Sequence, residues 1–216
     1  MNQRKLTPEI LDELPPDDPA AIRSRKDLKI INRMMGNYSW ISSRMAEIGG
    51  LWLELGAGAG SLSGYISDRG KLKVTGVDFA PCPERWPEEW SWHQGDLFAF
   101  LADQNHEAKG IAANLFLHHF TDDQLGEIGK RIPSRVDTLV FSEPARYFSH
   151  KIQGWLGFPI FNHVTRHDMI VSIEAGFRGD ELAEAMRLSR DEWQWQCSRS
   201  FWGAYRFEAR RRLPGG

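Results

Sequence analysis

Short apolar runs alternate with amphipathic stretches through the middle of the chain. A leucine-rich run at residues 50–55 and a β-branched run at 72–78 predict two buried strands. Further segments follow the same logic, with strands expected at 90–96, 109–117 and 136–144 and helices at 60–70 and 121–132. This order predicts an α/β fold, in which helices cover both faces of a doubly wound, mostly parallel sheet.

The N-terminal part of the chain has a different pattern. Residues 1–19 are polar and interrupted by prolines, which predicts a loose arm without a core of its own. Apolar positions at helical spacing then predict two amphipathic helices, at 20–35 and 38–49. We therefore expect residues 1–48 to form an arm with capping helices, set apart from a main domain.

The main domain, expected at 49–216, ends unlike a purely parallel sheet. Two alternating runs within residues 192–212 meet at Gly203 and predict a β-hairpin. The stretch between the fifth strand and this hairpin, residues 145–191, is too long for a single crossover helix. We expect a helical lid there.

Composition and charge narrow the functional classes. The 216 residues carry 27 basic and 29 acidic side chains, for a formal net charge of −2. A chain so close to neutral has no global electrostatic attraction to nucleic acid, and no stretch is long and apolar enough for stable membrane insertion. Two cysteines, Cys82 and Cys197, are too few for a disulfide framework or a cysteine-based zinc site, so we expect a cytoplasmic protein without a bound metal.

A glycine loop follows the first predicted strand. Gly56, Ala57, Gly58 and Gly60 lie where a bare backbone allows tight turning and close approach of a ligand. Helix N-termini after such loops usually suit anions such as pyrophosphate. However, Glu54 precedes the loop by two residues, and a buried carboxylate there would oppose a phosphate and favour a ligand with a cationic group. S-adenosylmethionine (SAM), which has an ammonium, a sulfonium and no phosphate, is such a ligand.

Two more acids occupy the tips of the next strands. Asp78 ends the second strand and could accept both ribose hydroxyls of the cofactor. Asp96 ends the third strand and could accept from the adenine amino group, while Leu97 offers a backbone N–H and apolar cover. Neighbouring positions at the strand tips complete the expected cofactor site: Phe79, Asn114 and Leu115.

Several of these segments carry a family resemblance. "LELGAGAG", "VTGVD", "QGDLF" and "NLFLHHFTDDQL" resemble, in order, the signature segments of class I SAM-dependent methyltransferases. The similarity covers about residues 50–142, and "SEPAR" and later segments look like a bacterial subgroup that acts on small molecules. The resemblance implies a seven-stranded Rossmann-like sheet with a reversed last strand, and SAM as cofactor. Lys109 departs from the family, which often has an acid there.

Methyl transfer to a hydroxyl also requires a group that removes the proton. "FLHHF" offers His118 and His119 just after the fourth strand. In similar plant-type O-methyltransferases a histidine of the resembling segment acts as the base, and His118 falls on that position. The alternative is that one or both histidines cap the next helix or pack beneath the loop.

Two further candidates lie later in the chain. His167 stands beside Asp168, although neighbours on a helix do not normally face each other, and Thr165 is the expected cap of that helix. Glu143 at the end of the fifth strand is expected to point into the pocket, where it could orient a histidine, and Arg146 could pair with it.

The acceptor itself is left open by the sequence. An apolar cluster in the lid favours either a pocket wall for an aromatic or acyl substrate or simple packing: Trp155, Leu156, Phe158, Ile160 and Phe161. We expect methylation of a phenol, enol or carboxylate oxygen, with transfer to carbon of an activated ring close behind. A nucleic-acid methyltransferase, a nicotinamide-dependent oxidoreductase and a catalytically inactive fold are the rivals. The oligomeric state is open.

Overall fold

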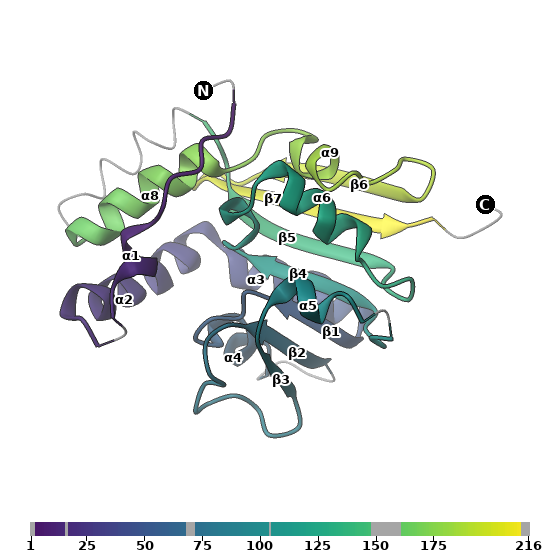
Figure 1. The fold of residues 1–216 in the computed structure, drawn as a ribbon, viewed down its shortest axis with the longest axis horizontal. Helices are drawn as coiled ribbons and strands as arrows, with labels where there is room; N and C mark the ends of the chain where they lie inside the picture. The colour runs from purple at the N-terminus through teal and green to yellow at the C-terminus, as the bar shows by residue number, and fades with distance from the viewer. Residues whose placement is uncertain (1–2, 16, 68–71, 104, 148–160, 213–216) are drawn as a thin grey trace.

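A seven-stranded sheet forms the centre of the computed structural model, which describes residues 3–15, 17–67, 72–103, 105–147 and 161–212 (Figure 1). The strand order is β3-β2-β1-β4-β5-β7-β6. The first five strands are parallel: β1 (Gly50–Leu55), β2 (Leu72–Asp78), β3 (Ser91–Gln94), β4 (Gly110–Asn114) and β5 (Thr138–Pro144). The predicted doubly wound α/β fold is confirmed.

The predicted hairpin closes the sheet. Strands β6 (Trp193–Arg199) and β7 (Ala204–Arg211) pair with each other in antiparallel register, and β7 runs antiparallel to β5. The turn contains Gly203, whose φ of 87° lies in the region that favours glycine. The reversed last strand that the family resemblance implied is therefore present.

The fourth strand is shorter than its sequence pattern suggests. The pattern predicts residues 109–117, but β4 ends at Asn114 because Leu115 adopts a left-handed φ of 52°, which no extended strand can contain. Leu117 instead opens a short 3-10 helix, η1 (Leu117–His119). This break turns both histidines away from the sheet and toward the acceptor end of the site.

Helices pack on both faces of the sheet. On one face, α3 (Asn37–Ile48) and α4 (Ser61–Ser67) share an apolar cluster with Trp52 of β1 and Val140 of β5. On the other face, residues of α5 (Leu97–Phe100), α6 (Asp122–Lys130) and α9 (Glu181–Ala185) pack around Phe141 and Phe207. Because α3 contributes the fully buried Ile41 to the first cluster, it belongs to the core rather than to a separate cap.

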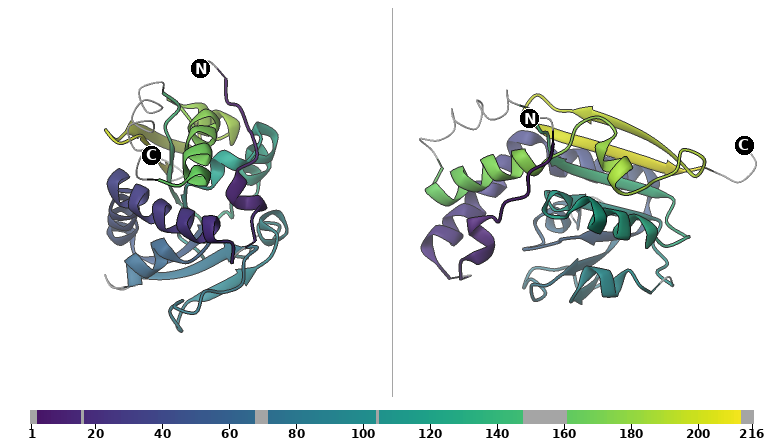
Figure 2. Two further views of the ribbon diagram at one scale, coloured as in Figure 1. Left: turned by 90° about the vertical axis from the view of Figure 1, so that its left-hand side faces the viewer. Right: turned by 45° about the horizontal axis from the view of Figure 1, so that its top comes forward.

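Three further helices gather where the parallel strands end: α1 (Ile10–Glu13), α2 (Pro19–Met35) and α8 (His163–Ala175) (Figure 2). The buried side of α2 is polar, with Ser24, Asp27 and Asn32 turned inward. Asp27 accepts from the Thr165 hydroxyl at 3.0 Å, so polar contacts join α2 to α8. In the described residues no helix combines the length and the apolar character needed to span a bilayer.

The start of α8 corrects one prediction. The sequence pattern predicts Thr165 as the cap of this helix, but Asn162 is the cap, and its side chain accepts from the Thr165 backbone N–H at 2.8 Å. Of the apolar lid cluster, Trp155, Leu156, Phe158 and Ile160 lie outside the described residues, and only Phe161 lies within them. The division of the chain into residues 1–48 and 49–216 stays a prediction.

Candidate functional site

The glycine loop lies between β1 and α4, at the carboxyl edge of the sheet. Gly56 has a φ of 66°, and a Cβ built on it would lie 2.1 Å from the Phe116 ring, so only glycine fits there. Gly58 has a φ of 51° and faces open space. Ala57 is buried, and Gly60 completes the turn beside Trp86. The loop therefore leaves room for a ligand at Gly58.

Asp78 ties this loop to the tip of β2. One carboxylate oxygen accepts from the Gly58 backbone N–H at 2.7 Å, and the other accepts from that of Ala80 at 2.8 Å. The neighbouring Phe79 ring is 72% exposed, which is unusual for a phenylalanine at the edge of a core. Asp78 and Phe79 thus border the same open space as Gly58.

Glu54 lies beneath the loop in a nearly dry environment. The residue is only 3% exposed, and its carboxylate accepts a hydrogen bond from the Ser63 hydroxyl of α4. Burial raises the pKa of Glu54 to about 7, despite the hydrogen bond, and the negative charge of Asp78 adds to the rise. A cation placed nearby would favour the ionised form of this carboxylate.

The tip of β3 is arranged differently from the expectation of a free acceptor. Asp96 caps α5, because its side chain accepts from the Ala99 backbone N–H at 2.8 Å. The residue is nevertheless exposed, so its second oxygen faces solvent. Leu97 is buried in the core. The backbone N–H of Gly95 donates to the Asp78 carbonyl at 2.9 Å, which holds the β2 and β3 tips together.

Polar groups without partners collect at the tips of β4 and β5. The Asn114 side-chain N–H donates to Asn32 of α2 at 2.9 Å, but its Oδ1 is buried and accepts no hydrogen bond among the described residues. The neighbouring Ser142 hydroxyl is in the same situation. Leu115, with its left-handed φ, follows directly. Buried unpaired polar atoms and a strained backbone together are typical of a ligand site.

His118 and Glu143 form a buried pair at the acceptor end of the site. Nδ1 of His118 donates to Glu143 at 2.7 Å, and Glu143 also accepts from the backbone N–H groups of Phe116 and Leu117 at 3.1 and 2.9 Å. Glu143 therefore orients the imidazole, as we expected, and it also holds η1. Arg146 binds Glu181, which is not the partner that the sequence suggested.

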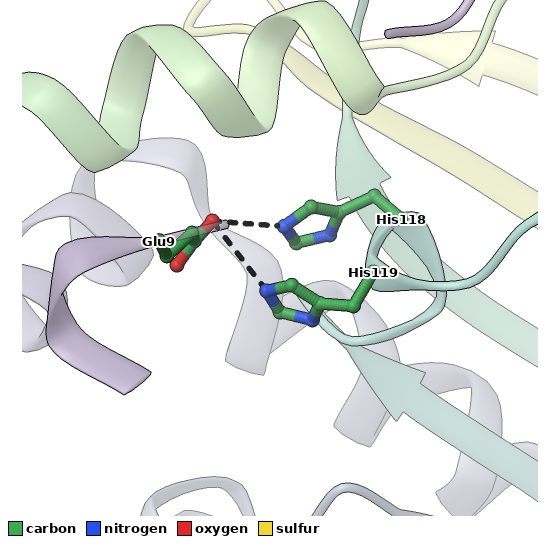
Figure 3. A group of neighbouring side chains, drawn as sticks. All are labelled: Glu9, His118 and His119. Atoms are coloured by element: carbon green, nitrogen blue, oxygen red, sulfur yellow. Dashed lines mark ion pairs between the residues drawn. The ribbon is translucent and has the colours of Figure 1, made fainter. Parts of the chain in front are cut away.

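The N-terminal arm supplies a residue that sequence reasoning missed. Glu9 reaches the two histidines, with its Oε1 3.5 Å from Nε2 of His118 and 3.4 Å from Nε2 of His119 (Figure 3). Ser172 of α8 donates its hydroxyl to the same carboxylate. No motif marks Glu9, and its only signal is an acid in a polar segment. A contact between residues so far apart in the chain leaves no local pattern.

Burial and ion pairing compete at this cluster. Burial alone would lower the pKa of His118, but hydrogen bonding and charge from Glu143 and Glu9 outweigh it and raise the pKa to about 9. Burial would raise the pKa of Glu9, yet the two histidines bring it below its usual range. The carboxylates therefore hold His118 as a cation in this arrangement.

His167 lies apart from the other candidates. Its Nδ1 is 2.9 Å from Asp168, so the two neighbours do meet, contrary to the expectation from helix geometry. Asp168 also accepts from the backbone N–H groups of Ile10 and Leu11 at 2.8 and 3.0 Å, which caps α1. The pair therefore fixes the N-terminal arm on α8 instead of serving the histidine cluster.

A pocket of about 250 Å³ opens at the histidine cluster. Its floor contains His118 and His119, and its walls come from the N-terminal arm and from α8: Leu6, Thr7, Pro8, Glu9, Asp12, Val171 and Ala175. The walls are partly apolar and the floor is ionic. Such a pocket suits a small molecule with one polar end.

Comparison with solved structures identifies the fold. The plantazolicin methyltransferase BpumL, in complex with SAH, matches with a TM-score of 0.70 at 11% identity over 91% of this chain and 92% of that one. The methyltransferase domain of bacterial CtHen1-C matches with a TM-score of 0.58 at 14% identity, over 81% and 96%. Human N-acetylserotonin methyltransferase, with SAM, matches with a TM-score of 0.54 at 18% identity, over 94% and 61%.

The likeness is one of structure and not of sequence. No protein-family model matches the chain, and no curated protein matches it significantly. The similarity lies in the three-dimensional arrangement, including the sheet with its reversed last strand. The chain therefore has the class I, Rossmann-like methyltransferase fold.

Proposed function

We propose that this protein binds SAM at the tips of β1 to β4 and transfers its methyl group to an oxygen of a small-molecule acceptor. The observation that carries the proposal is the pair of carboxylates, Glu54 and Asp78, beside an open glycine loop. A pyrophosphate would meet two like charges there, whereas the ammonium of SAM would meet a counter-charge. The methyltransferase fold and the SAH- and SAM-bound structures that share it support the same cofactor.

Each cofactor group has a candidate partner. Both Asp78 oxygens use one lone pair on backbone N–H groups, and each retains another for a ribose hydroxyl. Asp96 presents its free oxygen toward solvent beside the same space, where the adenine amino group would lie, and Leu97 follows it. Asn114 and Leu115, at the strained β4 tip, would border the methionine end.

The acceptor would bind in the pocket above the histidines. In-line transfer requires the acceptor oxygen to be held against the methyl group and to lose its proton. His118 is the proposed base, because Glu143 fixes its ring with Nε2 facing the pocket. His119, at the same end of the pocket, is the second candidate. The apolar walls favour a flat aromatic or acyl body, and transfer to an activated ring carbon is the alternative.

Asp78→Asn should weaken the binding of SAH by about 10- to 100-fold. An amide cannot accept on both of its atoms, so one of the two backbone N–H groups loses its partner and the ribose loses a charged acceptor, at about 1.5–3 kcal/mol per lost bond to a charged group. Isothermal titration calorimetry with SAH measures the loss. Asp137→Asn, at the opposite edge of the sheet, serves as the matched control and should bind like the wild type.

Two results would contradict the proposal. One is the absence of SAM or SAH binding to folded wild-type protein. The other is thermal stabilisation by NAD but not by SAH, which would favour an oxidoreductase. A salt-dependent shift with RNA in a gel assay would move the acceptor from a small molecule to nucleic acid, since a small-RNA methyltransferase, HEN1, is among the proteins with this fold.

A further inference from the structure

We infer that Glu9, His118 and His119 form a binding site for one divalent transition-metal ion, for which Zn²⁺ is the best match. Two imidazoles and one carboxylate are a ligand set that proteins use for catalytic zinc. The three ligand atoms lie within 4.8 Å of one another, at the floor of the pocket (Figure 3).

The orientation of both rings supports this inference. Nδ1 of His118 donates to Glu143 at 2.7 Å, and Nδ1 of His119 donates to the Phe116 carbonyl at 3.0 Å. Each ring proton is therefore placed on Nδ1, which leaves the Nε2 lone pairs directed toward Glu9. Metal-binding histidines are held in the same way, by a carboxylate or a backbone carbonyl behind the ring.

The spacing fits an ion better than hydrogen bonds. Nε2 of His118 and of His119 lie 3.5 and 3.4 Å from Glu9 Oε1, whereas N–H···O bonds are usually about 2.9–3.0 Å long. Ligands about 2.0–2.1 Å from a tetrahedral ion stand about 3.3–3.4 Å apart, which is close to the observed distances. Nε2 of His118 is also buried and has no hydrogen-bond partner in the part of the chain that the structure describes.

The charge around the cluster favours a cation. Glu143 lies behind His118, and Asp12 lines the same pocket as Glu9. Ser172 donates its hydroxyl to Glu9 and orients the carboxylate. With three protein ligands in place, the fourth tetrahedral position faces the pocket, where water or an oxygen of the acceptor could bind.

The ion would revise one step of the proposed function and leave the methyl donor unchanged. With Nε2 of His118 bound to the metal, this histidine cannot accept a proton. The acceptor hydroxyl would instead bind at the fourth position, where the positive charge lowers its pKa and its proton leaves to solvent water. The resulting oxygen anion then attacks the methyl group, and the sulfur of SAM keeps the bonding electron pair.

The test measures zinc binding alone, without SAM. Protein treated with EDTA and then dialysed is titrated with Zn²⁺ in a calorimeter, as the wild type and as the variants Glu9→Gln and His119→Gln. His119 has a side chain 34% exposed, so its replacement should leave the fold intact, which circular dichroism checks. His167→Gln is the control for adventitious binding, because His167 is exposed and lies outside the cluster.

The wild type should bind one ion per chain. Loss of a residue that only orients a ligand already costs about 10- to 100-fold in metal affinity, so loss of Glu9 or His119 as a ligand should cost more than about 100-fold. His167→Gln should bind like the wild type. Replacement of Zn²⁺ by Co²⁺ should give the intense visible absorption of a tetrahedral site in the wild type and not in the two variants.

Three outcomes would overturn the inference: no stoichiometric binding by the wild type, equal binding by all variants, or a loss in His167→Gln as large as in His119→Gln. The cluster would then be an ion-paired base and its carboxylates. Because the titration contains no SAM, a failure here is distinct from a failure of the proposed methyl transfer, which SAH binding by EDTA-treated protein tests separately.

Discussion

Glu54→Gln is expected to make the protein more stable at pH 8 and a weaker binder of SAH. The carboxylate has a pKa of about 7 in the folded protein and 4.5 when unfolded, so folding is coupled to proton uptake. The stability that protonated Glu54 contributes is fully present below pH 4.5 and is lost as the pH rises through about 7. Glutamine keeps the neutral form at every pH and still accepts from Ser63.

The expected size follows from the shift. A change from 4.5 to about 7 corresponds to roughly 3 kcal/mol at pH 8, or about 6–12 °C in melting temperature for a chain of this size. At pH 5 the variant and the wild type should melt at nearly the same temperature. Thermal unfolding followed by circular dichroism at both pH values measures the difference, with the exposed Glu88→Gln as control.

The same substitution should weaken SAH binding by about 10-fold or more, because the ammonium of the ligand loses its charged partner. Equal melting temperatures at pH 8 would mean that Glu54 carries no penalty for ionisation in the folded state. Unchanged SAH affinity would remove Glu54 from the cofactor site. A variant that is more stable and binds less well is what a functional, destabilising carboxylate predicts.

Gly129→Ala is expected to lower the free energy of unfolding by about 2–4 kcal/mol, although alanine is the better helix former. Gly129 lies near the end of α6, where α9 packs against it. A Cβ there would lie 1.9 Å from the backbone carbonyl oxygen of Met186, which cannot move as a flexible side chain would. The two helices must separate, and the apolar contacts between them weaken.

Gly64→Ala in α4 is the matched control. It places the same methyl group on a helical glycine with no atom within 4 Å of the new Cβ, so it should stabilise the protein by about 0.5–1 kcal/mol. Urea unfolding of both variants measures the two effects. Equal shifts of the same sign would show that helix propensity, and not packing of α6 on α9, governs Gly129.

The fold was predictable where local pattern and topology agree. Buried strands such as β2 (Leu72–Asp78) are short apolar runs, and the parallel order brings their tips to one edge, so the sequence was enough to place Glu54 and Asp78 beside the glycine loop. The pairing of His118 with Glu143 followed from the same edge. The strand predicted at 109–117 is too long, because sequence periodicity cannot detect the left-handed φ of Leu115.

Residues that act through distant contacts were not predictable. Glu9 and Ser172 reach the histidines from segments that no motif marks, and Asn32 reaches Asn114 from an inward-facing polar side of α2. A helix with polar residues inside contradicts the usual amphipathic pattern, so periodicity assigned α2 correctly as a helix and gave no information about its buried side.

The N-terminal arm has a consequence for how damage to this protein would be detected. Arg4 and Glu9 contact the acceptor end of the site through a few ionic and polar bonds, while the apolar clusters on the two faces of the sheet, as far as the structure describes the chain, include no residue of the arm. Folding of the sheet and assembly of the acceptor site are therefore separate events. A melting curve would report the first and be blind to the second, so a chain with an intact transition and a displaced arm would pass as native while being unable to turn over.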